Sequence, residues 1–323
     1  MMLKIILLPL CLLLGISCEA ALPKASFGTI ERLSNFQSQF VPARHIDIWF
    51  PQGYNKKTKY AVLYMHDGQM LFDATTTWNK QEWRVDEVGQ TLINQGKVQP
   101  FIVVGVHNGD ANRHAEYFPE RPFHSLTADQ QQLQYQQMRS EHIKLFSKPV
   151  YSDRYLKFLV SELKPYIDSH FSVYTDRAHT FVMGSSMGGL ISMYALNEYP
   201  EVFGGAACLS THWPGGFMTD DNPVPAKFFA YLAQHLPEPA AHKFYFDYGD
   251  QTLDARYPPL QKQVDAIMQQ KSYPAELWQS RFFAGADHSE KAWASRLDIP
   301  LTFLLAKPAI KTGVSNTDPS KKG

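Results

Sequence analysis

The sequence predicts an α/β fold in which a mostly parallel central sheet is covered by helices on both faces. One observation is that short β-rich apolar runs, which stop in polar or glycine-bearing turns, alternate with helix-like segments. A second is that the run over residues 179–186 leads through a glycine-framed turn into another apolar helical segment. Strands that alternate with helices are typical of parallel sheets, because each crossover helix packs on a face of the sheet.

Six runs are the expected strands of this sheet. They cover residues 45–51, 60–68, 100–109, 179–186, 204–211 and 242–250. The first run alternates apolar and polar residues, which suits an edge strand of a hairpin. Helix-like segments cover residues 83–95, 153–170 and 258–271, and a further helix is expected from Leu190 to Tyr199, before Pro200 ends it.

A single domain over residues 21–308 is expected, since no linker composition or internal repeat divides the 323 residues. The segment from about residue 120 to 150 is glutamine-rich and polar. It is interpreted as an insertion that lies over the active-site end of the sheet, and an ordinary surface helix is the alternative. Its apolar residues could form one helical face: Leu133, Met138, Ile143, Leu145 and Phe146. Residues 309–323 lack apolar content and predict a flexible tail.

Charge and histidine patterns exclude several function classes. Thirty-one basic residues balance 31 acidic ones, so nothing in the overall charge points to nucleic acid or an anionic membrane. The 12 histidines form no H-E-x-x-H motif or Cys/His cluster, so no metal site is predicted. Beyond the N-terminal segment, no stretch reaches the roughly 18 apolar residues of a transmembrane helix.

The first 20 residues have the pattern of a secretory signal peptide. Lys4 precedes an apolar stretch over residues 5–16, and small residues allow cleavage after Ala20. The pattern predicts a secreted or periplasmic protein. An alternative interpretation places a lipid anchor on Cys18, but Gly15 stands where a lipoprotein signal usually has a branched apolar residue.

The turn at residues 184–188 matches G-x-S-x-G, the pattern of a nucleophile elbow with Ser186 at its apex. Residues 181–183 supply the strand before it, and the helix follows. Glycines at 184, 188 and 189 allow a strained turn to pass close to neighbouring backbone. A flexible glycine turn is the simpler interpretation, but the strand-turn-helix context favours a nucleophile.

A serine nucleophile needs a base, and an acid to orient that base. In this fold order the base comes last, and His288 follows an apolar run and a Gly-Ala-Asp turn. The acid is expected after the preceding strand, where Asp250 and Asp254 both lie on a loop. Asp254 is preferred and Asp250 remains the alternative. The oxyanion donors are expected to be the backbone N–H groups of Met187 and Gln69.

Several segments together resemble the Putative esterase family of the α/β-hydrolases, which includes siderophore esterases, feruloyl esterases and mycolyltransferases. They are "LYMHDGQMLFD", "WRVDEV", "VGVHNGDANRHAEYFP", "GSSMGGLISMYAL", "DYGDQTLDARYPPLQKQVD" and "AGADHSEKAW", in the family's order from about residue 45 to 305. The resemblance implies an α/β-hydrolase fold and the same roles for Ser186, His288, Gln69 and Met187. Esterase members often have the acid three residues after the loop glycine, where this chain has Thr252, so the choice of acid stays open.

Five further residues are candidate substrate contacts. Asp67 precedes Gly68 in a loop that resembles the mycolyltransferase oxyanion loop. After the third expected strand, Asn108, Arg113 and Glu116 lie at the sheet end where such folds bind ligands. Arg113 either binds the substrate or pairs with Glu116, and Trp213 either lines an acyl pocket or packs in the core.

The sequence therefore predicts a serine esterase that acts on a small-molecule ester through an acyl-serine intermediate, without a metal or organic cofactor. One alternative is an acyltransferase that uses the same triad and passes the acyl group to a sugar or another alcohol. The other is a non-catalytic, ligand-binding member of the fold. Neither the ester nor the oligomeric state follows from the sequence.

Overall fold

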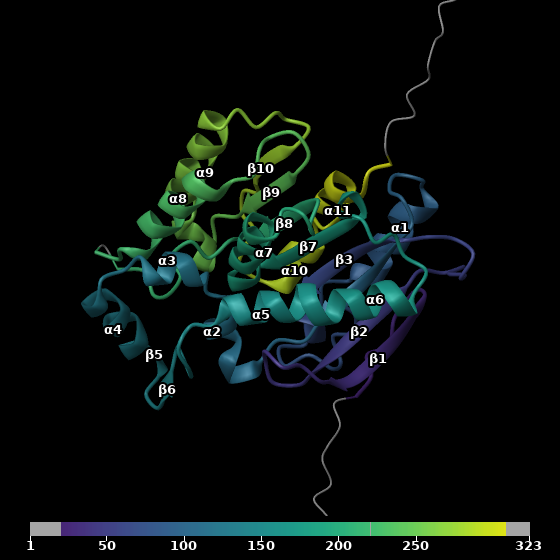
Figure 1. Ribbon diagram of the computed structural model, residues 1–323, viewed down its shortest axis with the longest axis horizontal. Helices are drawn as coiled ribbons and strands as arrows, with labels where there is room; N and C mark the ends of the chain where they lie inside the picture. The colour runs from purple at the N-terminus through teal and green to yellow at the C-terminus, as the bar shows by residue number, and fades with distance from the viewer. Residues whose placement is uncertain (1–20, 220, 308–323) are drawn as a thin grey trace, which may run out of the picture.

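The computed structural model describes residues 21–219 and 221–307, which form one eight-stranded sheet with helices on both faces (Figure 1). The strand order is β1-β2-β4-β3-β7-β8-β9-β10. Pairs β1/β2 and β2/β4 are antiparallel and the remaining pairs are parallel. The predicted signal peptide with Cys18, and the predicted tail, lie outside the described residues.

The strands of the main sheet are β1 (Thr29–Phe36), β2 (Arg44–Phe50), β3 (Ala61–His66), β4 (Phe101–Val106), β7 (Thr180–Ser185), β8 (Gly205–Leu209), β9 (Lys243–Tyr248) and β10 (Trp278–Phe282). All residues of β3, β4, β7 and β8 are buried. Consecutive side chains of these strands enter cores on opposite faces, which is why the runs are continuously apolar rather than alternating.

Helices α1 (Val85–Asn94), α10 (Glu290–Ala294) and α11 (Asp298–Leu305) contribute to the core on one face. The core on the other face includes residues of α5 (Ser152–Phe158), the π-helical η3 (Leu159–Leu163), α6 (Lys164–His170), α7 (Met187–Glu198), α8 (Val224–His235) and α9 (Pro258–Gln270). Shorter elements are η1 (Gly68–Met70), η2 (Asp110–Asn112), α2 (Arg113–Tyr117), η4 (Arg177–His179) and η5 (Thr252–Arg256). The predicted fold class is confirmed.

Two local expectations are wrong. Strand β2 is not at the edge, because β1, which the sequence did not reveal, pairs with it and forms the edge. Residues 120–150 do not form one apolar helical face. They form α3 (Glu120–His124), α4 (Ala128–Gln136) and a two-stranded sheet of β5 (Met138–Ser140) and β6 (Ile143–Lys144), which lie to one side of the main sheet (Figure 1). Leu133 and Ile143 are exposed, whereas Phe146 is buried in the core.

Within the described ranges, no helix is both long and apolar enough to cross a lipid bilayer.

Candidate active site

Ser186 lies at a sharp turn between the end of β7 and the start of α7. Its backbone has φ 57° and ψ −122°, a conformation that a residue with a side chain rarely adopts. Its N–H donates to the Leu209 carbonyl at the end of β8. A Cβ on Gly184 would lie 2.8 Å from the Gly188 carbonyl carbon, so the turn requires glycine at position 184. Ser186 is therefore held in the geometry of a nucleophile elbow.

His288 and Asp254 meet at the carboxyl end of the sheet, from the loops that follow β10 and β9. The distance between His288 Nδ1 and Asp254 Oδ1 is 2.6 Å. A carboxylate only accepts, so Nδ1 carries a proton, and in the neutral imidazole Nε2 then keeps its lone pair. The Thr252 hydroxyl accepts a hydrogen bond from the His288 N–H, which fixes the histidine backbone against η5. The imidazole thus has the tautomer that a general base requires.

The carboxylate of Asp254 is fully buried. Besides His288, it accepts from the Ser210 hydroxyl at 2.6 Å and from the Gly249 N–H at 2.7 Å, both on Oδ2. Burial alone would raise the pKa of Asp254, but the hydrogen bond and charge of His288 and the two further donors hold that pKa below its ordinary value. Asp254 is therefore ionised at neutral pH.

Asp250, the alternative acid, has a different set of partners. Its carboxylate accepts from the Gly285 N–H at 2.8 Å and from the Gln251 side chain at 3.0 Å. It fastens the turn that precedes His288 rather than orienting the imidazole. Of the two candidate carboxylates, the structure brings Asp254 to the histidine.

The loop after β3 carries the predicted oxyanion donor Gln69 in the short helix η1. A Cβ on Gly68 would lie 2.4 Å from the Gly105 carbonyl carbon, so the loop can approach β4 this closely only with glycine. Gln69 Oε1 accepts from the Asn108 N–H at 3.2 Å, which anchors its side chain. Met187 occupies the first turn of α7, where backbone N–H groups have no intrahelical acceptor.

Asp67, immediately before this helix, has a left-handed backbone with φ 57°. Arg113 donates to both of its carboxylate oxygens, from Nε at 2.6 Å and from Nη2 at 2.7 Å. Asn108 Nδ2 donates to the same carboxylate at 2.6 Å. Against the effect of burial, these donors and the Arg113 charge hold the pKa of Asp67 below its ordinary value. Three of the predicted contacts therefore form one cluster beside the predicted oxyanion loop.

The other two predicted contacts lie elsewhere. The fully buried Glu116 pairs with Arg44 through two hydrogen bonds of 2.7 and 2.9 Å, and it accepts from Tyr151. It is not Arg113's partner, because the buried guanidinium of Arg44 requires a counter-charge there. Trp213 is fully buried and donates to Gln261, so it belongs to the core. Neither Glu116 nor Trp213 is among the residues that line the cavities at Ser186.

Within the part of the chain that the structure describes, two cavities meet at Ser186. One of about 650 Å³ also contains His288 and Gln69, and its wall is polar and aromatic: Asp67, Trp78, Asn79, Gln81, Asn108, Asp110, Arg139 and Glu290. The other, of about 470 Å³, contains Met187 and the side chains of Leu145, Phe217, Met218, Leu253 and Tyr257, and its wall also includes His114, His212, Thr252 and Arg256. Arg113 lines both. Leu145 and Arg139 show that the 120–150 insertion contributes to the site.

A second histidine, His212, also borders the apolar cavity. Its ring nitrogens lie 2.7 Å from the Tyr257 hydroxyl and 3.0 Å from the Gly216 carbonyl oxygen. Burial, with a smaller effect of His288, lowers the pKa of His212 to about 4. With both nitrogens engaged, His212 is a neutral wall residue.

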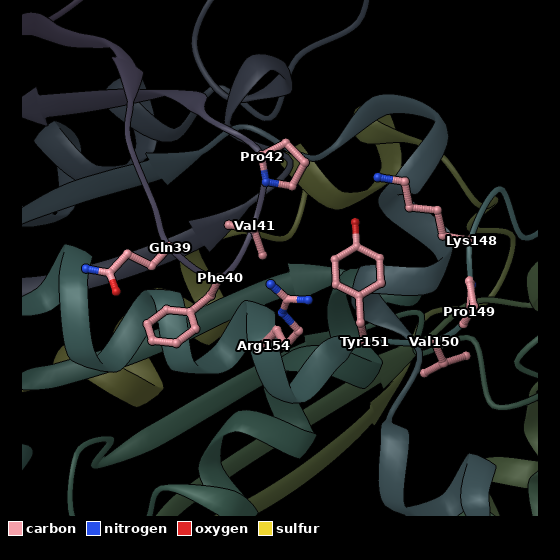
Figure 2. Close-up of a pocket in the computed structure, with 9 residues that line it drawn as sticks. All are labelled: Gln39, Phe40, Val41, Pro42, Lys148, Pro149, Val150, Tyr151 and Arg154. Atoms are coloured by element: carbon pink, nitrogen blue, oxygen red, sulfur yellow. The ribbon is translucent and has the colours of Figure 1, made fainter.

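Figure 2 shows a third cavity, of about 380 Å³, which lies between residues 39–42, residues 148–151 and Arg154. Its lining includes the cationic side chains of Lys148 and Arg154 but none of the predicted catalytic residues. Among the described residues, no group of three or more His, Cys, Asp or Glu side chains is arranged to hold a metal ion.

Comparison with known proteins gives a family match. The family model described as Putative esterase matches residues 42–304. An endo-1,4-beta-xylanase/feruloyl esterase of Xylanibacter ruminicola is 25% identical over 224 residues, which are 68% of this chain and 24% of that protein. YbbA of Bacillus subtilis, an uncharacterized protein, is 24% identical over 172 residues, 53% of this chain and 58% of its own. The matches thus span less than two thirds of these relatives.

Solved structures give the same fold. The enterobactin esterase of Shigella flexneri superimposes with a TM-score of 0.61 at 17% identity, covering 87% of this chain and 60% of that one. A ferulic acid esterase from Anaeromyces mucronatus superimposes with a TM-score of 0.56 at 16% identity, covering 88% and 95%. These similarities confirm the predicted α/β-hydrolase fold.

Proposed function

Because the chain belongs to the Putative esterase family, we propose that it is a serine esterase that hydrolyses carboxylic esters through an acyl-serine intermediate. The observation that carries the proposal is the 2.6 Å hydrogen bond between Asp254 and His288, because His288 lines a cavity that Ser186 also borders. This arrangement supports the proposed roles of Ser186 as nucleophile, His288 as base and Asp254 as acid.

In the proposed reaction, Ser186 Oγ attacks the ester carbonyl carbon while its proton passes to His288 Nε2. The negative charge that develops on the carbonyl oxygen is stabilised by the N–H groups of Gln69 and Met187. The tetrahedral intermediate then collapses, and the C–O bond to the alcohol breaks. His288 gives its proton to the leaving alcohol oxygen, and the acyl group remains on Ser186. Water repeats these steps and releases the acid.

The two cavities support one orientation of the substrate. The leaving oxygen must receive a proton from His288, which borders the larger, polar cavity, so the alcohol portion occupies that space. The acyl portion then lies in the apolar cavity beside Phe217, Met218 and Leu253. An aryl or other apolar acyl group suits this lining, and the names of the feruloyl and ferulic acid esterase relatives agree with that class. We further place the protein outside the cytoplasm, on the basis of its N-terminal sequence.

The direct test compares Ser186→Ala with Ser192→Ala, a buried serine of α7 whose hydroxyl donates to the Gly188 carbonyl. Hydrolysis of a p-nitrophenyl ester and covalent labelling by a fluorophosphonate are measured. Ser186→Ala should lose both, with a fall in kcat of up to roughly 10⁶-fold, while Ser192→Ala keeps both. Hydrolysis that survives in Ser186→Ala contradicts the proposal.

Two further outcomes identify the alternatives. If the natural protein forms a new ester when a sugar or glycerol is added, at the expense of the free acid, it is an acyltransferase. If it neither hydrolyses esters nor accepts the fluorophosphonate, it is a non-catalytic binding protein.

A further inference from the structure

Ser210, directly after β8, has a fully buried hydroxyl with three partners. Its Oγ lies 2.6 Å from Asp254 Oδ2, 2.9 Å from Trp293 Nε1 and 3.1 Å from Arg296 Nη2. The partners come from three parts of the chain: η5, α10 and the residues just before α11. The hydroxyl therefore joins the proposed triad acid to the segment that follows His288 in the chain.

The position of the hydroxyl proton follows from the chemistry of the partners. Indole Nε1 and guanidinium nitrogens only donate, so Trp293 and Arg296 occupy the two lone pairs of the Ser210 oxygen. The single O–H of Ser210 then has one acceptor left, which is the Asp254 carboxylate. Every hydrogen-bonding position of this hydroxyl is used.

The backbone of Ser210 is also constrained. Its φ is 41°, in the left-handed region that non-glycine residues rarely adopt. Its N–H donates to the carbonyl of Asp247 at 2.9 Å. The carboxylate of Asp247 in turn pairs with Arg296 through contacts of 2.8 and 3.1 Å, so the arginine cannot rotate away from Ser210. Ser210 thus has a strained backbone, and hydrogen bonds hold both its N–H and its hydroxyl. Residues of this kind are typical of functional sites.

We propose that Ser210 is a positioning residue for the reaction at Ser186, and that it orients the Asp254 carboxylate toward His288. This inference rests on the proposed esterase function. Asp254 Oδ2 is held by Ser210 and by the Gly249 N–H, which leaves Oδ1 directed at the imidazole. By donating to Asp254, Ser210 also withdraws part of the negative charge that stabilises protonated His288.

This withdrawal of charge has a consequence for pH dependence. Without the Ser210 donor, the full carboxylate charge acts on His288 and favours its protonated, inactive form. The acid limb of the kcat/KM profile should then move to higher pH. Charged and titratable groups around the pair remain in place in such a variant: Asp67, Arg113, His212, Asp247, Tyr257, Asp287, Glu290 and Arg296.

The experiment compares Ser210→Ala with Thr211→Val in the full-length protein. Thr211 is an adjacent buried residue whose hydroxyl donates to the Cys208 carbonyl, so its removal controls for the loss of a buried hydrogen bond. In Ser210→Ala, kcat should fall roughly 10- to 100-fold with KM changed less than about threefold. The acid limb should shift upward in pH. Thr211→Val should keep the natural profile.

Ser210→Cys is the second variant, because a thiol is a weak donor in the same place. It should recover part of kcat, and it serves as the test if Ser210→Ala does not fold. A kcat and an acid limb equal to those of Thr211→Val, in whichever variant folds, overturn this inference while leaving the esterase function intact. If the natural protein is not labelled by the fluorophosphonate, the proposed function itself fails instead.

Discussion

Arg113 holds Asp67 through two parallel hydrogen bonds, from Nε to Oδ1 at 2.6 Å and from Nη2 to Oδ2 at 2.7 Å. The guanidinium also lies 5.1 Å from the Tyr117 ring centroid, and the Tyr117 hydroxyl accepts from the Asp67 N–H. Because Asp67 precedes Gln69 in the same loop, this pair ties the proposed oxyanion donor to α2. Arg113 therefore supports the loop, whereas the sequence had left it between binding the substrate and pairing with Glu116.

Replacement of Arg113 should impair the reaction more than it impairs substrate binding. Arg113→Lys keeps the charge but loses the planar pair of donors, so the loop and the Gln69 N–H lose their fixed position. We expect kcat to fall roughly 10- to 100-fold and KM to change little. Arg113→Gln should cost more, because a buried carboxylate then lacks its counter-charge. Steady-state kinetics and thermal melting measure both effects. Unchanged kcat in Arg113→Gln would exclude this role.

The two candidate acids provide a matched pair of variants. Asp254→Asn should reduce kcat by roughly 10³- to 10⁴-fold, because an amide can donate to His288 Nδ1 and favour the wrong tautomer. Asp250→Asn can still accept from the Gly285 N–H and should lose less than about tenfold. Kinetics on one ester, with circular dichroism to check folding, separates the two. A larger loss in Asp250→Asn than in Asp254→Asn would reverse the assignment.

The sequence predicted the residues that local pattern determines. Ser186 follows from its glycine frame between strand and helix, and His288 from its place after the last strand. The sequence favoured Asp254 over Asp250 but left both open, because both lie on one loop and only its 3-10 turn at η5 directs Asp254 to the imidazole. Strand β1 was missed because its exposed and half-buried residues lack a clear apolar pattern.

Polar pairs between residues far apart in the sequence were the other feature that the sequence did not predict. Glu116 was assigned to the site because it follows Arg113 by three residues, but its partner Arg44 is 72 residues away. Ser210 lies in the run "CLSTHW" and carries no motif. Its three partners come from distant segments, so no spacing rule connects them. A short polar residue directly after a buried parallel strand was the available signal, since such positions face the ligand-binding edge of the sheet.

Filling the apolar cavity should change acyl preference without affecting the alcohol side. Met218→Trp places a larger side chain in the 470 Å³ cavity and reduces its open space. Esters with bulky acyl groups should therefore lose more kcat/KM than acetyl esters of the same alcohol. The matched control is Trp78→Ala, which alters the polar cavity at a side chain that is 84% exposed. It should change discrimination among alcohols while the acyl preference stays. The reverse pattern would mean that the substrate binds in the opposite orientation.

Hydrogen bonds from Ser26 and Phe27 attach the residues before β1 to a carboxyl group of α1, and the titration of this group should make stability depend on pH. Asp86 Oδ2 accepts from the N–H groups of Ser26 at 2.6 Å and Phe27 at 3.1 Å. Burial, together with neighbouring Glu87, raises the pKa of Asp86 to about 7 in the folded protein. In the unfolded chain the pKa is near 4. Between these values the folded state binds a proton that the unfolded state lacks, so stability falls as pH rises from about 4 to 7.

Asp86→Asn should remove this loss, because the amide oxygen still accepts from the backbone and the side chain stays neutral. We expect a higher Tm than that of the natural protein at pH 8, by roughly 2–4 °C for each kcal/mol recovered, and little gain at pH 4. Asp73→Asn is the control: Asp73 also accepts from the N-terminal segment, at Lys24, but hydrogen bonds from Thr75 and Lys24 outweigh burial and lower its pKa. It should not raise the Tm at pH 8. Equal melting curves for Asp86→Asn and the natural protein at pH 8 would show that Asp86 carries no such proton.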